Sequence, residues 1–299
     1  MNWSPRQQRK NDLLFAAARA GIGLGLALPR TWLGPVGDLL GFGAYALLGR
    51  ARRAALDNLA RVHPELGADA RRALARATFR SLGRNLTDTL ALLDPKEAPA
   101  RSLEVSASSE RVLSDALAEG RGVIYATCHL GPWERMAALL AARGFPITTV
   151  ARESYDPRFH RLVYERLRAR RNVEAIYRGQ PNAPFAIVRA LRRGRVLGLL
   201  LDMPGRIASR GVTWLGLPSR MPVGAARLAL RLRSPVVVGT PAPNSEGLEI
   251  RIARLAVDDL APGDRGEAEL SQRMADALSD RIRLLPTHWP WMHPTFTET

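Results

Sequence analysis

A histidine and a glutamate five positions apart, His129 and Glu134, are residue types that general acid–base chemistry uses often. On one continuous helix they would lie about 140° apart around the axis, because each residue advances by about 100°. Gly131 and Pro132 stand between them and favour a turn instead. A turn that enters a helix would bring the carboxylate near the imidazole. There it could fix the tautomer and leave the other ring nitrogen as a base.

No side chain beside this pair is a plausible nucleophile. Cys128 precedes His129 on a predicted strand, so the two side chains point to opposite faces. No Gly-x-Ser-x-Gly sequence occurs in the chain. The pattern therefore predicts a direct transfer in which a substrate hydroxyl or water attacks. The structural alternative is a histidine bonded to a backbone carbonyl and a glutamate that interacts with a helix dipole.

The other four histidines lack a carboxylate in a comparable setting, so we predict no metal site. These residues are His63, His160, His288 and His293.

The elements that must position these residues follow an alternating pattern. The predicted strands are 122–127, 147–151, 173–177, 196–201, 235–239 and 248–253. The predicted helices are 51–62, 69–93, 133–143, 156–171, 183–193, 224–233 and 267–285. This pattern predicts an α/β fold, with a single mixed, parallel-rich sheet covered by helices. Ligands meet the carboxyl ends of such strands, where His129 and Asp202 lie.

Residues 1–50 form a separate apolar segment, and residues 51–299 form the α/β domain. Two apolar stretches, 13–28 and 32–48, contain Arg19 and Asp38 respectively and lie between basic clusters. Crossing a bilayer takes about 20 apolar residues, so neither stretch is a clean spanning helix. We predict a membrane-associating helical hairpin with both ends cytoplasmic. A cleaved signal peptide and a helix buried in a soluble core are the alternatives.

Composition narrows the function classes. The net charge of +16 arises almost entirely from arginine and attracts nucleic acid, anionic lipid headgroups or an acidic carrier protein. We disfavour nucleic-acid binding because the arginines are spread along the chain and aromatic residues make up only 6%. Cys128 is the single cysteine, which excludes an internal disulfide framework. No glycine-rich turn follows the first strand, so we predict no dinucleotide cofactor.

The segment His129-Leu-Gly-Pro-Trp-Glu134 resembles the H-x4-D/E signature of the lysophospholipid acyltransferase superfamily. The surrounding sequence is most similar to the late acyltransferases of lipid A biosynthesis, the lauroyl and myristoyl transferases. The pieces that carry this likeness are Arg53-Ala-Ala-Leu-Asp-Asn58, Val62-His-Pro-Glu65, Arg80-x3-Arg84, Val150-Ala-Arg152, Ile176-Tyr-Arg178, Leu201-Asp202, Gly224–Leu230, Pro235-Val-Val and Trp289-Pro-Trp-Met-His293.

The resemblance implies transfer of a fatty acyl chain from acyl carrier protein or acyl-coenzyme A to a glycolipid hydroxyl. The expected acceptor is a lipid A precursor at the cytoplasmic face of the inner membrane, and no cofactor is implied. His129 would be the general base, and Glu134 would hold the imidazole. By analogy with other acyl transfers, backbone N–H groups of Gly131 and Trp133 would stabilise the oxyanion.

The resemblance also implies substrate-binding residues. Arg152 and Arg178 would bind phosphate oxygens, and Asp202 would organise the site. We expect the arginine-rich helices 156–171 and 183–193 to dock the carrier protein, using Arg166, Arg168 and Arg170. Pro294 replaces an arginine that the family tends to carry, and no glutamine adjoins Asp202. These departures leave open another acceptor, such as a phosphatidylinositol mannoside or a lysophospholipid.

Overall fold

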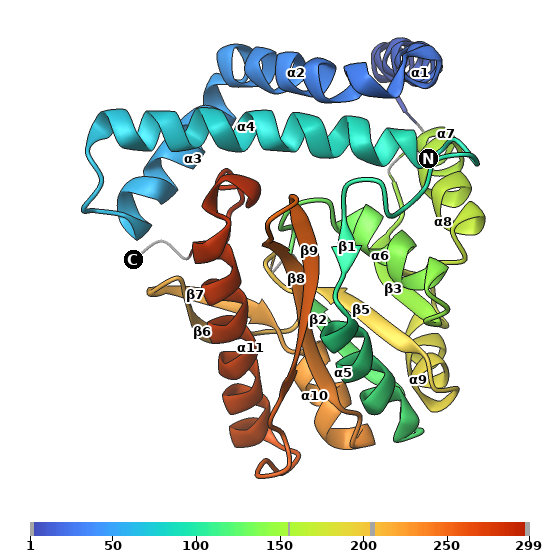
Figure 1. Cartoon of the computed structure of the whole chain (residues 1–299), viewed down its shortest axis with the longest axis vertical. Helices are drawn as coiled ribbons and strands as arrows, with labels where there is room; N and C mark the ends of the chain where they lie inside the picture. Colours follow the sequence, from blue (N-terminus) through green and yellow to red (C-terminus); the bar gives the residue numbers. More distant parts are fainter. Residues whose placement is uncertain (1–2, 155, 204–206, 297–299) are drawn as a thin grey trace.

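A seven-stranded sheet forms the centre of the computed structural model, which describes residues 3–154, 156–203 and 207–296 (Figure 1). Its strands lie in the order β1-β9-β8-β2-β5-β3-β4, and all neighbouring pairs are parallel except β8 and β9. In that order their bounds are Glu104–Val105, Leu248–Leu255, Val236–Pro243, Val123–Thr127, Val196–Leu200, Ile147–Arg152 and Glu174–Arg178. The predicted mixed, parallel-rich sheet is confirmed.

Helices cover both faces of this sheet (Figure 1). Their bounds are α5 Ala107–Ala118, α6 Trp133–Ala142, α7 Pro157–Phe159, α8 Arg166–Arg170, α9 Ala183–Arg192, α10 Gly224–Leu232 and α11 Asp264–Leu284. A π-helical turn, His160–Glu165, joins α7 to α8, so the predicted helix over 156–171 is irregular. The sequence analysis missed α5, β1 and a separate antiparallel hairpin made of β6 Ser209–Trp214 and β7 Leu217–Pro222.

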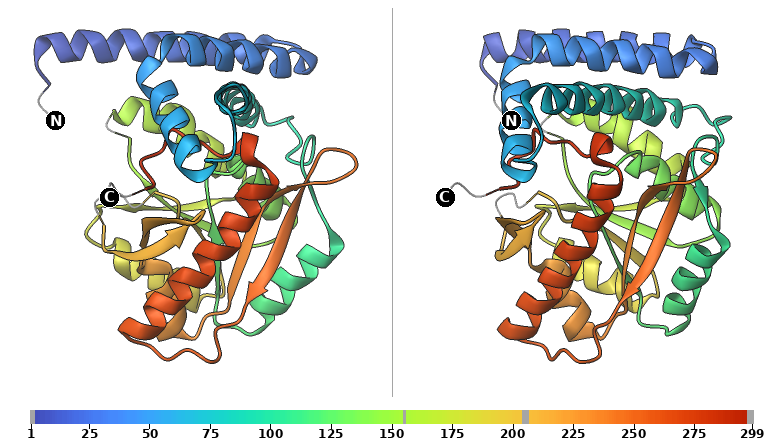
Figure 2. Two further views of the ribbon diagram at one scale, coloured as in Figure 1. Left: turned by 90° about the vertical axis from the view of Figure 1, so that its left-hand side faces the viewer. Right: turned by 60° about the vertical axis from the view of Figure 1, so that its left-hand side comes forward.

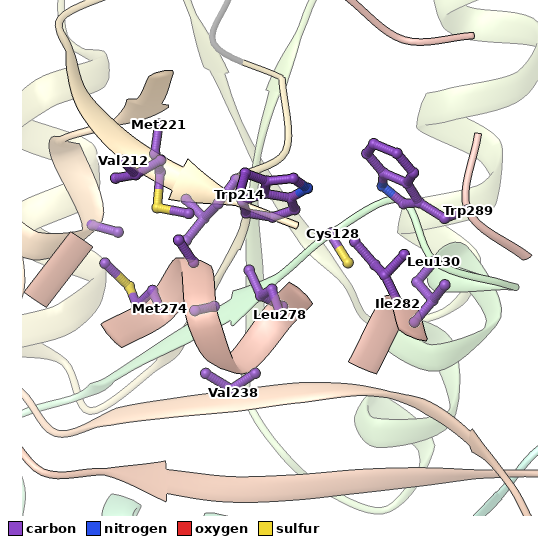
Figure 3. Close-up of a cluster of buried hydrophobic side chains, with 14 of the residues drawn as sticks. Cys128, Leu130, Val212, Trp214, Met221, Val238, Met274, Leu278, Ile282 and Trp289 are labelled. Carbon is purple, nitrogen blue, oxygen red and sulfur yellow. The ribbon is translucent and has the colours of Figure 1, made fainter. Parts of the chain in front are cut away.

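The central strand β2 is buried along its whole length, because alternate residues enter two different cores. Ile124 and Ala126 pack into the core that contains α10 and α11. Val123 and Tyr125 pack into the core that contains α5 and α6. Cys128 continues the first series and lies in the core near Trp289 (Figure 3). The carboxyl end of β2 is therefore held rigidly from both sides.

The N-terminal helices form a layer at one end of the molecule (Figure 2). Its members are α1 Pro5–Ala27, a 3-10 turn Arg30–Trp32, α2 Leu33–Leu47, α3 Gly49–Val62 and α4 Ala68–Ala91. α1 and α2 are outermost, and α4 lies between them and the sheet (Figure 2). None of the helices in the described ranges has the length and hydropathy needed to cross a bilayer.

Glycines set the distance between α2 and α4. A Cβ on Gly83 would lie 2.0 Å from the carbonyl oxygen of Gly37, and one on Gly41 would lie 2.3 Å from that of Phe79. The two helices therefore touch at the backbone, which only residues without a side chain allow.

The outer face of α1 and α2 is apolar. Nine of the fifteen exposed large apolar side chains of the described chain fall between residues 13 and 48, and Leu47 is 84% exposed. This exposure contradicts the alternative in which the segment is a helix buried in a soluble core. An apolar patch of this kind marks an interaction surface.

Candidate active site

The strand order brings His129 and Asp202 together. β2 and β5 are hydrogen-bonded neighbours, with Thr127 in register with Leu200. His129 lies two residues beyond the end of β2, and Asp202 lies two residues beyond the end of β5. Both residues therefore emerge at the same edge of the sheet, where ligands bind in open α/β folds.

Asp202 forms two hydrogen bonds with His129. Its Oδ1 lies 2.8 Å from Nδ1 of the imidazole, and its Oδ2 accepts the His129 backbone N–H at 2.9 Å. The indole N–H of Trp289 donates to the same Oδ2 at 3.0 Å. Asp202 is only 1% exposed, so these three donors replace the hydration that burial removes.

The two groups shift each other's pKa values. Burial opposes ionisation of Asp202, but the charge and hydrogen bonds of His129 outweigh it and lower the Asp202 pKa to about 2. Burial also lowers the pKa of His129, but the Asp202 charge and hydrogen bond raise it, with a smaller contribution from Glu134. The net result lies above the usual 6.5. An ionised Asp202 accepts a hydrogen bond from the Nδ1–H group of His129, which leaves the Nε2 lone pair free to take a proton.

The predicted position of Glu134 is wrong in one respect. Asp202, and not Glu134, bonds the Nδ1 atom of His129. Glu134 is the second residue of α6 and lies 3.3 Å from Nη2 of Arg168 on α8. Its charge reaches the imidazole only through space. The helix directs this carboxylate towards α8, a neighbour that local sequence spacing does not reveal.

Two backbone N–H groups of the turn after His129 are hydrogen-bonded to carbonyl groups of the protein. Gly131 has φ +58°, in the left-handed region that glycine favours, and its N–H donates to the His288 carbonyl at 3.0 Å. The Trp133 N–H donates to the Gly131 carbonyl at 3.0 Å. The prediction that Gly131 and Trp133 supply oxyanion donors is therefore wrong for this conformation, because both groups are engaged.

His293 completes the surroundings of the imidazole and was not predicted to do so. Its ring centroid lies 5.3 Å from that of His129, edge to face, and Trp133 makes a similar contact at 5.0 Å. Burial lowers the pKa of His293 to about 4, although Asp202 opposes the shift, so the ring is neutral at pH 7. The closing Trp289–His293 segment brings it there, far from His129 in sequence.

One ligand atom from each of His129, Asp202 and His293 lies within 4.8 Å of the others, so this trio could hold a metal ion. Sequence reasoning missed this group because its members come from three separate segments. The carboxylate already accepts two hydrogen bonds from His129 and one from Trp289. The carboxylate and the imidazole are thus hydrogen-bonded to each other, as a proton-transfer pair requires.

Arg152 and Arg178 end the neighbouring strands β3 and β4 and are paired in register. Both are exposed at the same edge of the sheet as His129. With about 4.8 Å between strands, they lie roughly 10 and 14 Å from the line of β2. The structure brings the two arginines together but does not place them against His129.

The expected carrier-docking arginines on α8 differ in exposure. Arg168 is buried, with its guanidinium on Glu134, and Arg170 donates to the carbonyl of Leu93. Arg166 is exposed. Arg168 is therefore withdrawn from the docking prediction, because its charge is used inside the site.

Comparison with known proteins agrees with this geometry. Residues 10–298 match the family model of the bacterial lipid A biosynthesis acyltransferases. Over 184 residues the chain is 28% identical to the phosphatidylinositol mannoside acyltransferase of Mycobacterium tuberculosis, in strain CDC 1551 / Oshkosh and in strain ATCC 25618 / H37Rv. Each match covers 61% of this chain and 57% of the relative, so it spans little more than half of that protein.

Proposed function

Because the chain belongs to the bacterial lipid A biosynthesis acyltransferase family, we propose that it transfers a fatty acyl chain from an acyl thioester to a glycolipid hydroxyl. The observation that carries the proposal is the bond between His129 Nδ1 and the buried Asp202 at the carboxyl end of parallel strands. This pairing creates a general base without a protein nucleophile beside it. Cys128 is fully buried, and burial raises the pKa of its thiol.

The reaction begins with deprotonation of the acceptor. Nε2 of His129 takes the hydroxyl proton as the oxygen attacks the thioester carbonyl, and an oxygen–carbon bond forms. Asp202 stabilises the resulting imidazolium, and Glu134 adds a second negative charge at longer range. The carbon–sulfur bond then breaks, and the leaving thiolate recovers the proton from Nε2. The products are an ester and a free thiol.

Two acceptors are supported by separate comparisons. The family model supports a lipid A precursor, which is our first candidate. The similarity to a phosphatidylinositol mannoside acyltransferase supports a mannoside acceptor as the second. Both are phosphorylated glycolipids, for which the paired arginines Arg152 and Arg178 are suitable phosphate ligands.

We place the donor, acyl carrier protein or acyl-coenzyme A, at the surface of α9. Arg189, Arg192 and Arg193 are exposed, and in the described chain none of them has an acidic partner. Phe185, 73% exposed, adds an apolar contact on the same helix. A basic surface with an apolar centre suits an acidic carrier protein.

We place the α1–α2 layer on the cytoplasmic face of the inner membrane. Its exposed apolar side chains would enter the bilayer interface, and flanking basic residues would meet anionic headgroups. Leu39, Phe42 and Leu47 are among the most exposed of these side chains.

The test is lipid mass spectrometry in a host whose glycolipids lack one secondary acyl chain. Expression of the protein should add the mass of one fatty acyl group to a glycolipid. His129→Ala should abolish the gain, and Asp202→Asn should reduce it. A gain on another lipid would keep the chemistry and change the acceptor. A gain that persists in His129→Ala, or no change in any lipid with the native chain, would contradict the proposal.

A further inference from the structure

A pocket of about 500 Å³ lies between α2, α4 and the turn that follows His129. Pro132 of that turn forms part of its wall, but His129 does not line it. Eleven of its sixteen lining residues have polar side chains. Its walls include Leu33, Gly34 and Asp38 of α2, so it lies directly beneath the apolar outer layer.

The charges in this pocket are unevenly matched. Arg80 and Arg84 share one carboxylate, that of Asp38, at 3.0 Å for Arg80 and 2.6 and 2.5 Å for Arg84. The hydrogen bond from Arg84 lowers the Asp38 pKa, so Asp38 is ionised at pH 7. Two guanidinium groups bound to one carboxylate have a net charge of +1. Both arginine side chains remain more than half exposed and can accept a second anion.

One residue of the pocket lining carries a buried donor without a partner. Asn85 is only 9% exposed and lines the pocket. Its Nδ2 is buried and has no hydrogen-bond partner among the residues that the structure describes. An unpaired buried amide is costly unless a ligand accepts from it.

Thr287 and His288, which also line the pocket, supply neutral hydrogen-bonding groups. Burial and the charge of Arg84 both lower the pKa of His288, so its imidazole is neutral at pH 7. Its Nδ1 lies 2.9 Å from the Thr287 hydroxyl. The His288 carbonyl accepts the Gly131 N–H, which couples these residues to the turn beside His129. Hydroxyl and imidazole groups suit a polyol better than a bare anion.

We propose that this pocket binds the phosphorylated, hydroxyl-rich headgroup of a membrane lipid. The excess positive charge would bind its phosphate, and Asn85, Thr287 and His288 would bind its hydroxyls. The inference rests on the proposed function only where it identifies the bound lipid as the acyl acceptor. If the lipid is the acceptor, the pocket holds the part of the headgroup remote from the reacting hydroxyl, because His129 lies outside the pocket wall.

The first experiment measures binding calorimetrically with the full-length protein in detergent. The probes are hexose 1-phosphate, glycerol 3-phosphate and unphosphorylated hexose. We expect at least one phosphorylated probe to bind, and Arg84→Gln and Asn85→Leu each to weaken that binding about tenfold, the value of a charged or buried hydrogen bond. Preference for the hexose phosphate identifies a glycolipid headgroup, and preference for glycerol phosphate identifies a phospholipid.

Arg72→Gln is the matched control, since Arg72 is exposed on the same helix and does not line the pocket. Binding should stay within twofold of the native value. Asn85→Leu removes an unpaired polar group, so the melting temperature should not fall, and it is measured in parallel. The proposal is overturned if the native protein binds neither phosphorylated probe, or if both pocket variants bind like the native protein.

A kinetic experiment separates this proposal from the proposed function. Arg84→Gln and Asn85→Leu should raise the KM for a glycolipid acceptor about tenfold, while hydrolysis of the acyl thioester by water stays within twofold. Complete absence of transfer and hydrolysis in the native protein would contradict the proposed function. The calorimetric binding result alone would then test whether the pocket binds a lipid headgroup. An unchanged acceptor KM would show that the lipid bound there is not the acceptor.

Discussion

The edge formed by β2 and β5 and the layer formed by α1 and α2 depart from the usual distribution of polarity in opposite ways. The sheet edge buries an ionised carboxylate, that of Asp202, which is 1% exposed. The helical layer exposes apolar side chains, of which Leu47 is 84% exposed. Each departure costs free energy in a soluble protein unless something compensates for it.

The compensation differs between the two regions. At the sheet edge it is internal, because N–H donors from His129 and Trp289 satisfy the carboxylate. At the layer nothing in the described chain covers the apolar face, and our proposal assigns that role to the membrane. We therefore expect substitutions at the sheet edge to reduce activity. Substitutions in the helical layer should instead reduce binding to the membrane.

His129→Ala should have the largest effect. Removing a general base typically costs about 10²–10⁴ in rate, and we expect a loss of kcat near the upper end of that range. Binding to vesicles should remain unchanged, because His129 is not one of the exposed apolar side chains of the layer. Steady-state kinetics and vesicle sedimentation on the same preparation test both halves. A variant that keeps more than a tenth of native kcat would remove His129 from the mechanism.

Asp202→Asn should lower kcat by about 10²-fold, because the amide no longer favours the Nδ1–H tautomer or stabilises the imidazolium. Removing the negative charge should also lower the pKa of His129, which Asp202 now raises. The pH dependence of kcat/KM and the melting temperature are the measurements. A loss of activity that merely follows a loss of folded protein would count against this role.

Gly83→Ala should destabilise the contact between α4 and α2. A Cβ at this position would lie 2.0 Å from the Gly37 carbonyl oxygen, and overpacking of this kind costs about 1–3 kcal/mol. Gly43→Ala on α2 is the matched control, because no atom lies within 4 Å of its Cβ position. Denaturant unfolding of the two variants should give opposite signs, since alanine favours a helix where space is open. Equal effects would contradict the close packing.

Leu47→Ser should weaken binding to anionic vesicles about tenfold, corresponding to about 1.5 kcal/mol for one apolar side chain leaving the interface. Activity on substrates dispersed in detergent should not change. Leu284→Ser is the control, because Leu284 is also exposed but lies on α11, outside the layer. If both variants partition like the native protein, the layer does not bind the membrane through this side chain.

Glu134→Gln should have the smallest effect. The base form of His129 is neutral, so kcat/KM should rise with pH as the imidazole loses its proton, with a midpoint above 6.5. Removing the Glu134 charge should move this midpoint to lower pH by about half a unit, a free-energy change of roughly 0.7 kcal/mol. A pH–rate profile measures the shift. A midpoint that moves upward would show that Glu134 does not act on His129 electrostatically.

Much of the fold followed from local patterns. The six predicted strands are all present, with small differences at their ends, because short apolar runs that enter two cores read clearly in sequence. β1 escaped prediction because it is only two residues long. The β6–β7 hairpin escaped because its turn, Leu215-Gly216, lacks the usual signal and places Leu215 at φ +51°.

The position of the histidine that we propose as the base was also predictable, but its partner was not. His129 and Asp202 each follow an apolar strand, which marked both as candidates. Sequence spacing favoured Glu134 as the partner because it is near in the chain. The actual partner is 73 positions away, and only the lateral pairing of β2 with β5 places it beside the imidazole.

The amino-acid sequence by itself determined the elements and the chemistry carried at their ends. It could do so because periodicity, turn residues and the chemical type of each side chain are local properties. The tertiary structure alone decided which carboxylate bonds His129, which arginine neutralises Glu134 and which histidine closes the site. Those choices depend on strand order and helix packing. Contacts between residues far apart in the chain determine both, and no local pattern specifies which of them form.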